Sequence, residues 1–154
     1  MRPDVNATAD ILSAADARVI GVSEEAYGVA CLVEASNLDG ALRALAADGY
    51  DYLVDLFGTD TGEAIEVTHH LRCLSDMREV FVKTVVPYDG EAPSCWQVYP
   101  AALFAEREAA ELLGLTFAGH PNLKRLLTSD EVDGFLLRKD VAIRTEEEVT
   151  LLGD

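Results

Sequence analysis

The residues of this chain most able to bind a metal ion are its histidines, and their spacing keeps them apart. His69 and His70 are neighbours in a segment of alternating apolar and polar residues, so on a strand they would point to opposite faces. The alternation predicts that His69 is a core histidine and that His70 faces solvent or a partner. His120 follows much later, in a Gly-His-Pro turn. Because a metal site needs several convergent ligands, the sequence predicts no histidine metal site.

Nucleophilic chemistry has no better support. Ser94 or Cys95 with His120 and Asp140 would supply the residue types of a hydrolytic triad, but neither nucleophile lies in a turn of the G-x-S-x-G type. No glycine-rich loop joins a strand to a helix in the way that phosphate binding requires. The cysteines are odd in number, widely spaced and without a C-x-x-C pair, which favours neither a disulfide framework nor an iron–sulfur or zinc site. They are Cys31, Cys73 and Cys95.

The triplet Glu106-Arg107-Glu108 is the remaining candidate for acid–base chemistry. Successive residues of a helix lie about 100° apart, so these side chains fan out and cannot act on one substrate atom. Arg107 lies one helical turn from Glu111 and can pair with it. We therefore interpret the triplet as structural, with Glu106 and Glu108 holding the turns that follow the helix. No catalytic, cofactor-binding or metal-binding residue is predicted.

The charge of the chain is strongly acidic and unevenly distributed. The formal net charge is −16, which repels nucleic acid and anionic lipid and makes direct binding to either improbable. Residues 121–144 are the exception, because they contain five basic and four acidic residues and so have a local charge of +1. Such an island suits an acidic partner surface. No apolar stretch is long enough to span a membrane, and no signal sequence is expected at the N-terminus.

Apolar periodicity predicts an α+β fold with helices packed on a mixed or antiparallel sheet, in the order α-β2-α-β3-α. Thr8 is expected to cap the first helix, and the second helix should lie between a cap at Asn37 and a stop at Gly49. The last three strands should form an antiparallel meander. The first and last helices are predicted at 7–17 and 100–113, and the strands at 18–22, 27–33, 51–57, 64–74 and 79–86.

The last predicted helix leads into an irregular C-terminal docking segment. Pro100 suits the first turn of this helix, because its missing N–H costs little there, and Gly114 should end it. Small side chains along one face would let the helix lie close to the sheet. The residues of this face are Ala101, Ala102, Ala105, Ala109 and Leu112.

The segment from residue 106 to residue 140 resembles the signature of the 30-kDa subunit family of respiratory complex I, the bacterial form of which is NADH-quinone oxidoreductase. Upstream, Leu53-Val54-Asp55 and the strand from Glu66 to Leu74 resemble the two central strands of that family. The matching residues of the signature are Glu106-Arg107-Glu108, Leu113-Gly114, Phe117, Gly119-His120-Pro121, Leu123, Arg125-Leu126-Leu127 and Leu137-Arg138-Lys139-Asp140.

The resemblance implies a non-catalytic subunit in the peripheral arm of a complex I-type oxidoreductase. Its partners would be the large quinone-site subunit and the small iron–sulfur subunit, on the cytoplasmic face of the membrane. No cofactor would be bound by this chain, and iron–sulfur clusters would lie in the partner subunits. Equivalent subunits occur in group 4 membrane-bound nickel–iron hydrogenases and in formate hydrogenlyase, which stay open as alternatives. A free-standing acidic α+β binding module is the alternative from another class.

If the chain is such a subunit, we expect one domain over residues 1–144 and an acidic tail over 145–154. Partner docking is expected where basic residues gather in the otherwise acidic chain, together with the helix triplet that precedes them. The predicted docking residues are Glu106, Arg107, Glu108, Gly119, His120, Pro121, Lys124, Arg125, Arg138 and Lys139.

Overall fold

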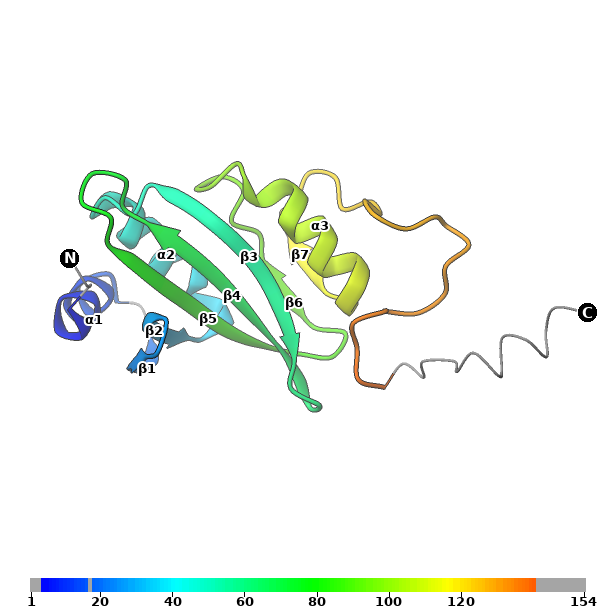
Figure 1. Ribbon diagram of the computed structural model, residues 1–154, viewed down its shortest axis with the longest axis horizontal. Helices are drawn as coiled ribbons and strands as arrows, with labels where there is room; N and C mark the ends of the chain where they lie inside the picture. Colours follow the sequence, from blue (N-terminus) through cyan, green and yellow to red (C-terminus); the bar gives the residue numbers. More distant parts are fainter. Residues whose placement is uncertain (1–3, 17, 141–154) are drawn as a thin grey trace, which may run out of the picture.

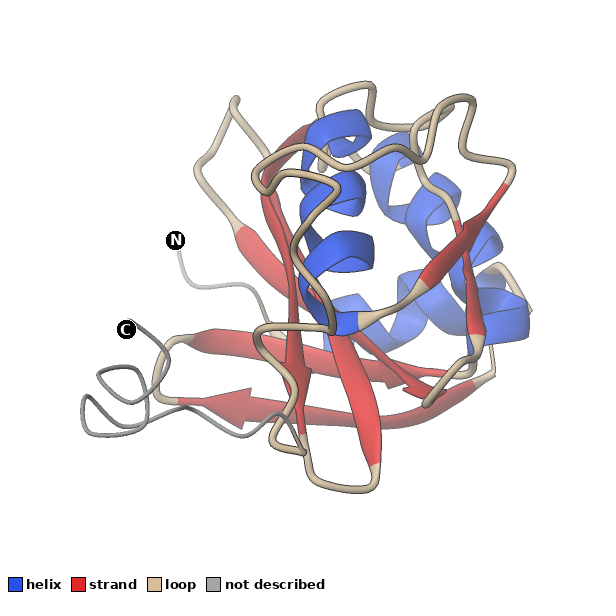
Figure 2. Cartoon of the chain, turned by 90° about the vertical axis from the view of Figure 1, so that its right-hand side faces the viewer, coloured by secondary structure: helices blue, strands red, loops and turns tan. Residues whose placement is uncertain are grey.

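The computed structural model describes residues 4–16 and 18–140, in which three helices pack against a five-stranded sheet (Figures 1 and 2). This arrangement confirms the predicted α+β class, while the predicted acidic tail lies outside the described residues. The helices are α1 (Val5–Ala14), α2 (Leu38–Ala47) and α3 (Ala102–Leu113), with a 3-10 turn at Ala35–Asn37. The strands are β1 (Val19–Glu25), β2 (Gly28–Val33), β3 (Tyr52–Asp60), β4 (Ala64–Arg72), β5 (Glu79–Pro87), β6 (Glu91–Pro93) and β7 (Thr116–Ala118).

The large sheet is mixed, with the strand order β1-β2-β5-β4-β3. β3, β4 and β5 form the antiparallel meander that the sequence predicts, and β1 pairs antiparallel with β2. β2 lies parallel to β5 and so joins this hairpin to the meander. The hairpin turn is tighter than predicted, because β1 extends to Glu25 and β2 begins at Gly28. β6 and β7 form a separate parallel pair beside α3.

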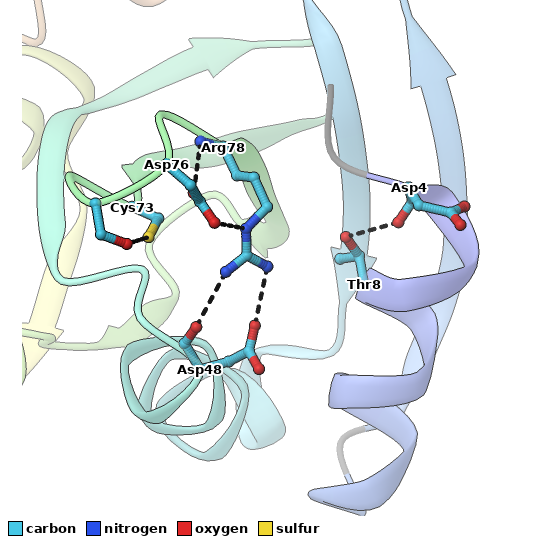
Figure 3. Close-up of polar contacts among 7 residues, drawn as sticks. Asp4, Thr8, Asp48, Cys73, Asp76 and Arg78 are labelled. Carbon is cyan, nitrogen blue, oxygen red and sulfur yellow. Dashed lines mark hydrogen bonds and ion pairs between the residues drawn. The ribbon is translucent and has the colours of Figure 1, made fainter. Parts of the chain in front are cut away.

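The first helix begins earlier than the sequence predicts and ends at Ala14. Its N-cap is Asp4, whose carboxylate accepts a hydrogen bond from the Asn6 N–H at 2.9 Å. The predicted cap, Thr8, lies buried inside the helix, where its hydroxyl donates to the Asp4 carbonyl at 3.3 Å (Figure 3). The prediction was wrong because aspartate and threonine are both good caps, and the apolar pattern around Leu12 fits either start.

The turn between β4 and β5 is tied to the end of α2 by Arg78 (Figure 3). Its Nε donates to Asp76 Oδ2 at 2.7 Å, and its terminal nitrogens donate to the carboxylate and carbonyl of Asp48 at 3.1 and 3.3 Å. The guanidinium also lies 5.0 Å from the centre of the Tyr50 ring. The Arg78 backbone N–H bonds to the Asp76 carboxylate and lowers the pKa of that group. These contacts fix α2 against one end of the meander.

α2 buries the face that the sequence predicts, and Gly49 follows it with a φ of +99°. Asn37 stands at the predicted cap position but makes no side-chain capping bond, because the chain enters the helix through a 3-10 turn. The buried residues of α2 are Leu38, Ala41, Leu42 and Leu45.

α3 packs on β3 with a buried face that overlaps the predicted one and also includes Glu106 and Leu113. The helix begins after Ala101, so Pro100 precedes it instead of forming its first turn. Leu113 packs over Gly58 of β3, where an added Cβ would collide with the leucine side chain. The predicted alanine stripe is confirmed at Ala102 and Ala109, but it left out Glu106, whose carboxylate is bonded in the interior. The buried residues of α3 are Ala102, Glu106, Ala109 and Leu113.

Candidate docking surface

After β7 the chain runs past α3 as a strap, defined here as residues 119–140, which contains turns and bends but no helix or strand (Figure 1, yellow to orange). All ten residues predicted to dock a partner lie on α3 or on this strap. Their side chains fall into two groups, those that hold the strap or its surroundings in place and those that face outward. The contacts of each group show which of the ten can meet a partner.

Glu106 ties α3 to the loop that precedes it. Its side chain is fully buried, Oε1 accepts a hydrogen bond from the Cys95 N–H at 2.7 Å, and Oε2 accepts one from the Ser94 hydroxyl. His120 Nε2 lies 4.0 Å from the same carboxylate. Glu106 therefore does not face a partner. Glu108, predicted to hold the following turns with it, lies exposed on the outer side of the helix.

Arg107 holds the middle of the strap. Its Nε donates to the Lys124 carbonyl at 2.7 Å, and its Nη2 donates to the Arg125 carbonyl at 2.6 Å. The predicted pairing of Arg107 with Glu111 does not occur, because the guanidinium reaches these main-chain oxygens and Glu111 bonds to the residues that follow. Arg107 and Glu111 therefore bond to neighbouring parts of the strap.

Glu111 forms the second attachment of the strap. Its carboxylate accepts backbone N–H bonds from Leu126 at 2.6 Å, from Leu127 at 3.0 Å and from Thr128 at 2.6 Å. The Thr128 hydroxyl donates a further bond to it. The bond from the Thr128 hydroxyl has the largest effect on the pKa of Glu111, and together with the backbone N–H bonds it lowers that pKa to about 2.

Acid should therefore release this part of the strap. The pKa of Glu111 falls from an ordinary 4.5 to about 2 on folding, so its contribution is complete above pH 4.5 and is lost as the pH falls through about 2. In that range we expect the amides of Leu126, Leu127 and Thr128 to lose their protection, so that each exchanges closer to the rate of an unbonded amide at the same pH. At pH 6, Glu111→Gln should already exchange fast at these amides and Glu108→Gln should not. Equal protection in both variants would contradict the assignment.

His120 anchors the start of the strap rather than facing outward. Its side chain is 1% exposed, Nε2 lies 3.0 Å from the Leu103 carbonyl, and Nδ1 accepts the Asn122 N–H at 3.0 Å. This pattern fits the neutral tautomer that carries its proton on Nε2. Trp96 adds a second anchor, since its indole N–H donates to the Gly119 carbonyl at 2.9 Å. The Gly-His-Pro turn is thus fixed by polar contacts within the chain.

Arg138 anchors the far end of the strap at the C-terminus of α3. Its Nε donates to the Leu113 carbonyl at 2.6 Å and its Nη2 to the Gly114 carbonyl at 3.3 Å. The guanidinium lies 4.5 Å from the centre of the Phe135 ring and 4.9 Å from that of Tyr88. A cation at the last carbonyls of a helix is favourable because those oxygens carry the negative end of the helix dipole.

A further polar contact joins the strap to the large sheet. The Lys139 backbone N–H donates to Asp60 Oδ2 at 2.7 Å, and the Tyr88 hydroxyl donates to Asp60 Oδ1 at 2.5 Å. The bond from Tyr88 is the main reason that the pKa of Asp60 is lowered, and the same bond raises the pKa of Tyr88 to about 12. Lys139 therefore acts here through its main chain, and its side chain is left exposed.

Four of the ten predicted docking residues are internal ties. Glu106 and His120 are buried, Arg138 is 9% exposed, and Arg107 is half-buried against strap carbonyls. Their polar atoms are bonded within the chain, so we expect these four residues to support the strap and not to contact a partner directly. The exposed residues of the predicted set are Glu108, Gly119, Pro121, Lys124, Arg125 and Lys139.

Sequence reasoning missed the apolar side chains that the strap presents to solvent. Their exposed fractions run from 36% for Leu123 to 60% for Leu127. The available signal was the run of consecutive apolar residues at 135–137, which fits neither a helical nor a strand period. Phe104 of α3, 63% exposed, is also an apolar surface residue. The exposed apolar residues of the strap are Leu123, Leu127, Phe135, Leu136 and Leu137.

His69 and the three cysteines are buried. His69 is fully buried in the core as predicted, and desolvation lowers its pKa to about 4. Burial raises the pKa of the Cys31 thiol to about 12 and also raises that of Cys95. Within residues 4–16 and 18–140, no three side chains of His, Cys, Asp or Glu come together as a set of metal ligands.

The chain purified alone should accordingly be colourless and free of stoichiometric metal. The reason is that its histidines and thiols do not converge, and the buried thiols resist the deprotonation that metal binding requires. The measurement is the iron, zinc and nickel content by mass spectrometry after chelation and dialysis. One equivalent of any of these metals retained after that treatment would contradict the prediction.

Two solved structures share this fold. A chain described as the trypsin-resistant fragment of Nqo5 superposes with a TM-score of 0.65 at 25% identity, covering 75% of this chain and 98% of the fragment. A chain of the membrane-bound sulfane sulfur reductase, an archaeal respiratory membrane complex, gives a TM-score of 0.75 at 21% identity, covering 90% and 85% of the two chains. The protein is therefore an α+β chain of the class that these two structures define.

The family follows from the sequence. Residues 31–147 match the model of the respiratory-chain NADH dehydrogenase 30-kDa subunit, so the chain belongs to that family. An NADH-quinone oxidoreductase subunit of Moorella thermoacetica is 42% identical over 101 residues, which cover 64% of this chain and 68% of that protein. The resemblance carried by residues 106–140 is thus confirmed. No helix in the described ranges is long and apolar enough to cross a membrane.

Proposed function

We propose that this chain is a peripheral subunit of a complex I-type, membrane-associated oxidoreductase, in which it holds neighbouring subunits together and contributes no reacting group. Its neighbours are the large quinone-site subunit and the small iron–sulfur subunit, on the cytoplasmic side of the membrane. Family membership supports the kind of complex, and the strap supports the holding role.

The observation that carries this proposal is a fixed backbone that presents apolar side chains. Arg107 and Glu111 of α3 bond to main-chain groups of the strap, and His120 of the strap contacts the Leu103 carbonyl of α3. A segment that only covered α3 would turn its leucines inward, yet Leu127 is 60% and Leu137 57% exposed. Contiguous exposed apolar side chains mark protein interfaces, and a backbone ordered in advance loses less entropy on binding.

The reactive groups of the described chain serve structure in this proposal. The Cys31 thiol and the His69 imidazole are buried, with pKa values that disfavour their charged forms. We propose accordingly that the chain binds no cofactor of its own and that the iron–sulfur clusters of the complex lie in partner subunits. Electron transfer would then depend on this chain only through the amount of complex that assembles.

Charge reversal at an exposed strap residue tests the holding role. Arg125→Glu should lower the yield of assembled complex, because removing one partner of an interface ion pair costs about 2–5 kcal/mol. The measurement is the amount of complex recovered from solubilised membranes with a tagged chain, together with turnover per assembled complex. Arg43→Glu is the control for charge reversal away from the strap; Arg43 is an exposed arginine of α2 that pairs with Asp39 at 2.8 Å, so its yield is compared after correction for any loss of stability in urea unfolding.

Normal recovery of the Arg125→Glu complex would count against the strap as the docking surface. Unchanged recovery with a large fall in turnover would instead give this chain a direct part in the chemistry. The same purification separates the alternatives. Copurification with a nickel-containing subunit would assign the chain to a group 4 hydrogenase, and recovery of the chain alone would favour a free-standing binding module.

A further inference from the structure

A pocket of about 210 Å³ lies between α3 and the strap. Ala110 and the buried Leu115 contribute apolar surface to it, and Leu123 and Phe135 of the strap line it further. The pocket is open to solvent on one side, so an apolar side chain such as leucine or phenylalanine can enter it from outside.

Three cations surround this apolar pocket. Arg107, Lys124 and Arg125 all contribute to its lining, against the single carboxylate of Glu111. Glu111 already accepts three strap N–H groups and a hydroxyl, so its charge is engaged with the strap itself. In the described ranges, none of the three cations forms an ion pair with a carboxylate. That is unusual in a chain with 28 acidic and 12 basic residues.

The two arginines are held at the pocket by hydrogen bonds to uncharged oxygens. Arg107 donates to the carbonyls of Lys124 and Arg125, and Arg125 donates to the Thr128 hydroxyl at 2.9 Å and the Ser129 carbonyl at 3.2 Å. Lys124 is exposed. Neutral oxygens fix the guanidinium groups in place without cancelling their charge, so a carboxylate beside the pocket would gain from all three.

We propose that this pocket receives an apolar side chain from a partner subunit, with one or more carboxylates next to it in the partner's sequence. The inference rests on the proposed function and adds the chemistry of the partner segment. The apolar surface selects the anchoring side chain, and the cations select its acidic neighbours. Nucleic acid is disfavoured, because the net charge of −16 repels a phosphate backbone.

The test uses the assembled complex from the source cell, with the photoreactive amino acid p-benzoylphenylalanine in place of Leu123 at the pocket. A second version carries it in place of Ile20 of β1, which is 62% exposed and serves as the control position. After irradiation, the cross-linked peptides are identified by mass spectrometry. The expected product joins residue 123 to a partner segment whose apolar residue lies within two residues of Asp or Glu.

Charge dependence provides the second readout. Lys124→Glu with Arg125→Glu should lower the cross-link at residue 123 at least about tenfold per assembled complex, because like charges then face each other. Lys124→Arg with Arg125→Lys should retain it. A cross-link at residue 123 that maps to a basic or uncharged segment, to lipid or to nucleic acid would overturn the inference, as would no change on charge reversal.

The test separates failure of the inference from failure of the proposed function. If the subunits copurify normally but residue 123 gives no partner cross-link, the pocket is not a receptor and the proposed function stands. If no subunit copurifies with the tagged wild-type chain, the proposed function fails and the inference fails with it.

Discussion

Replacing Glu106 by alanine is expected to lower the free energy of unfolding by about 3–5 kcal/mol, because a fully buried acceptor is removed from two donors. The Cys95 N–H, bonded to Glu106 at 2.7 Å, and the Ser94 hydroxyl would both lose their partner. The lost side chain would also leave a cavity between α3 and the loop before it. The measurement is equilibrium unfolding in urea.

Two variants make this prediction specific. Glu108→Ala, two residues along the same helix but exposed, should change the free energy of unfolding by no more than about 0.5 kcal/mol. Glu106→Gln keeps the shape and one acceptor, so it should cost clearly less than the alanine variant. If Glu106→Ala and Glu108→Ala were equally mild, the buried contacts of Glu106 would have no role in stability.

The meander could be predicted because its signals are local, whereas the parallel pairing of β2 with β5 and the β6–β7 pair could not. The alternation in β4 and the turns that flank it give both the strands and their antiparallel order, which the structure confirms. The face of α3 could not be predicted in the same way. Glu106 reads as a surface residue in any hydrophobic pattern, and its burial depends on donors from Ser94 and Cys95 that become neighbours only in the fold.

The predicted docking residues also combine a feature that the sequence pattern reveals with contacts that form only in the fold. The gathering of basic residues singled out the stretch that we predict to dock, but the sequence could not tell residues that hold the strap from residues that face outward. Arg107 and Arg138 bind main-chain carbonyls, and any residue type has a carbonyl, so no sequence pattern reports these contacts. The outward set includes the exposed cations Lys124, Arg125 and Lys139 and the apolar side chains of the strap.

Replacing Gly114 by alanine is the change expected to disturb the strap most. Gly114 ends α3 with a φ of +71°, a conformation that costs a residue with a Cβ about 1–2 kcal/mol. An added Cβ would also lie 2.5 Å from the Phe135 ring and 2.7 Å from Arg138 Nη2. Both side chains must then move, and Arg138 would lose its bonds to the last carbonyls of α3.

Gly62→Ala is the matched control for this variant. Gly62 has a φ of +97°, but an added Cβ would meet nothing within 4 Å, so only backbone strain is expected there. Gly114→Ala should cost about 1 kcal/mol more than Gly62→Ala in urea unfolding, the low end of the range for overpacking, because the added Cβ meets the outer ends of the Phe135 and Arg138 side chains. It alone should speed hydrogen exchange at the Leu137 amide, which bonds to the Leu112 carbonyl at 3.0 Å.

The consequence for assembly follows from the role of the strap. If the strap docks a partner, Gly114→Ala should reduce the recovered complex, while Gly62→Ala should do so only as far as it lowers stability. Turnover per assembled complex should match wild type in both variants, because neither change touches a reacting group. Equal recovery of the two complexes, despite a mobile Leu137 in the Gly114 variant, would mean that the partner orders the strap itself. The attachments of Arg138 would then stabilise the free chain alone.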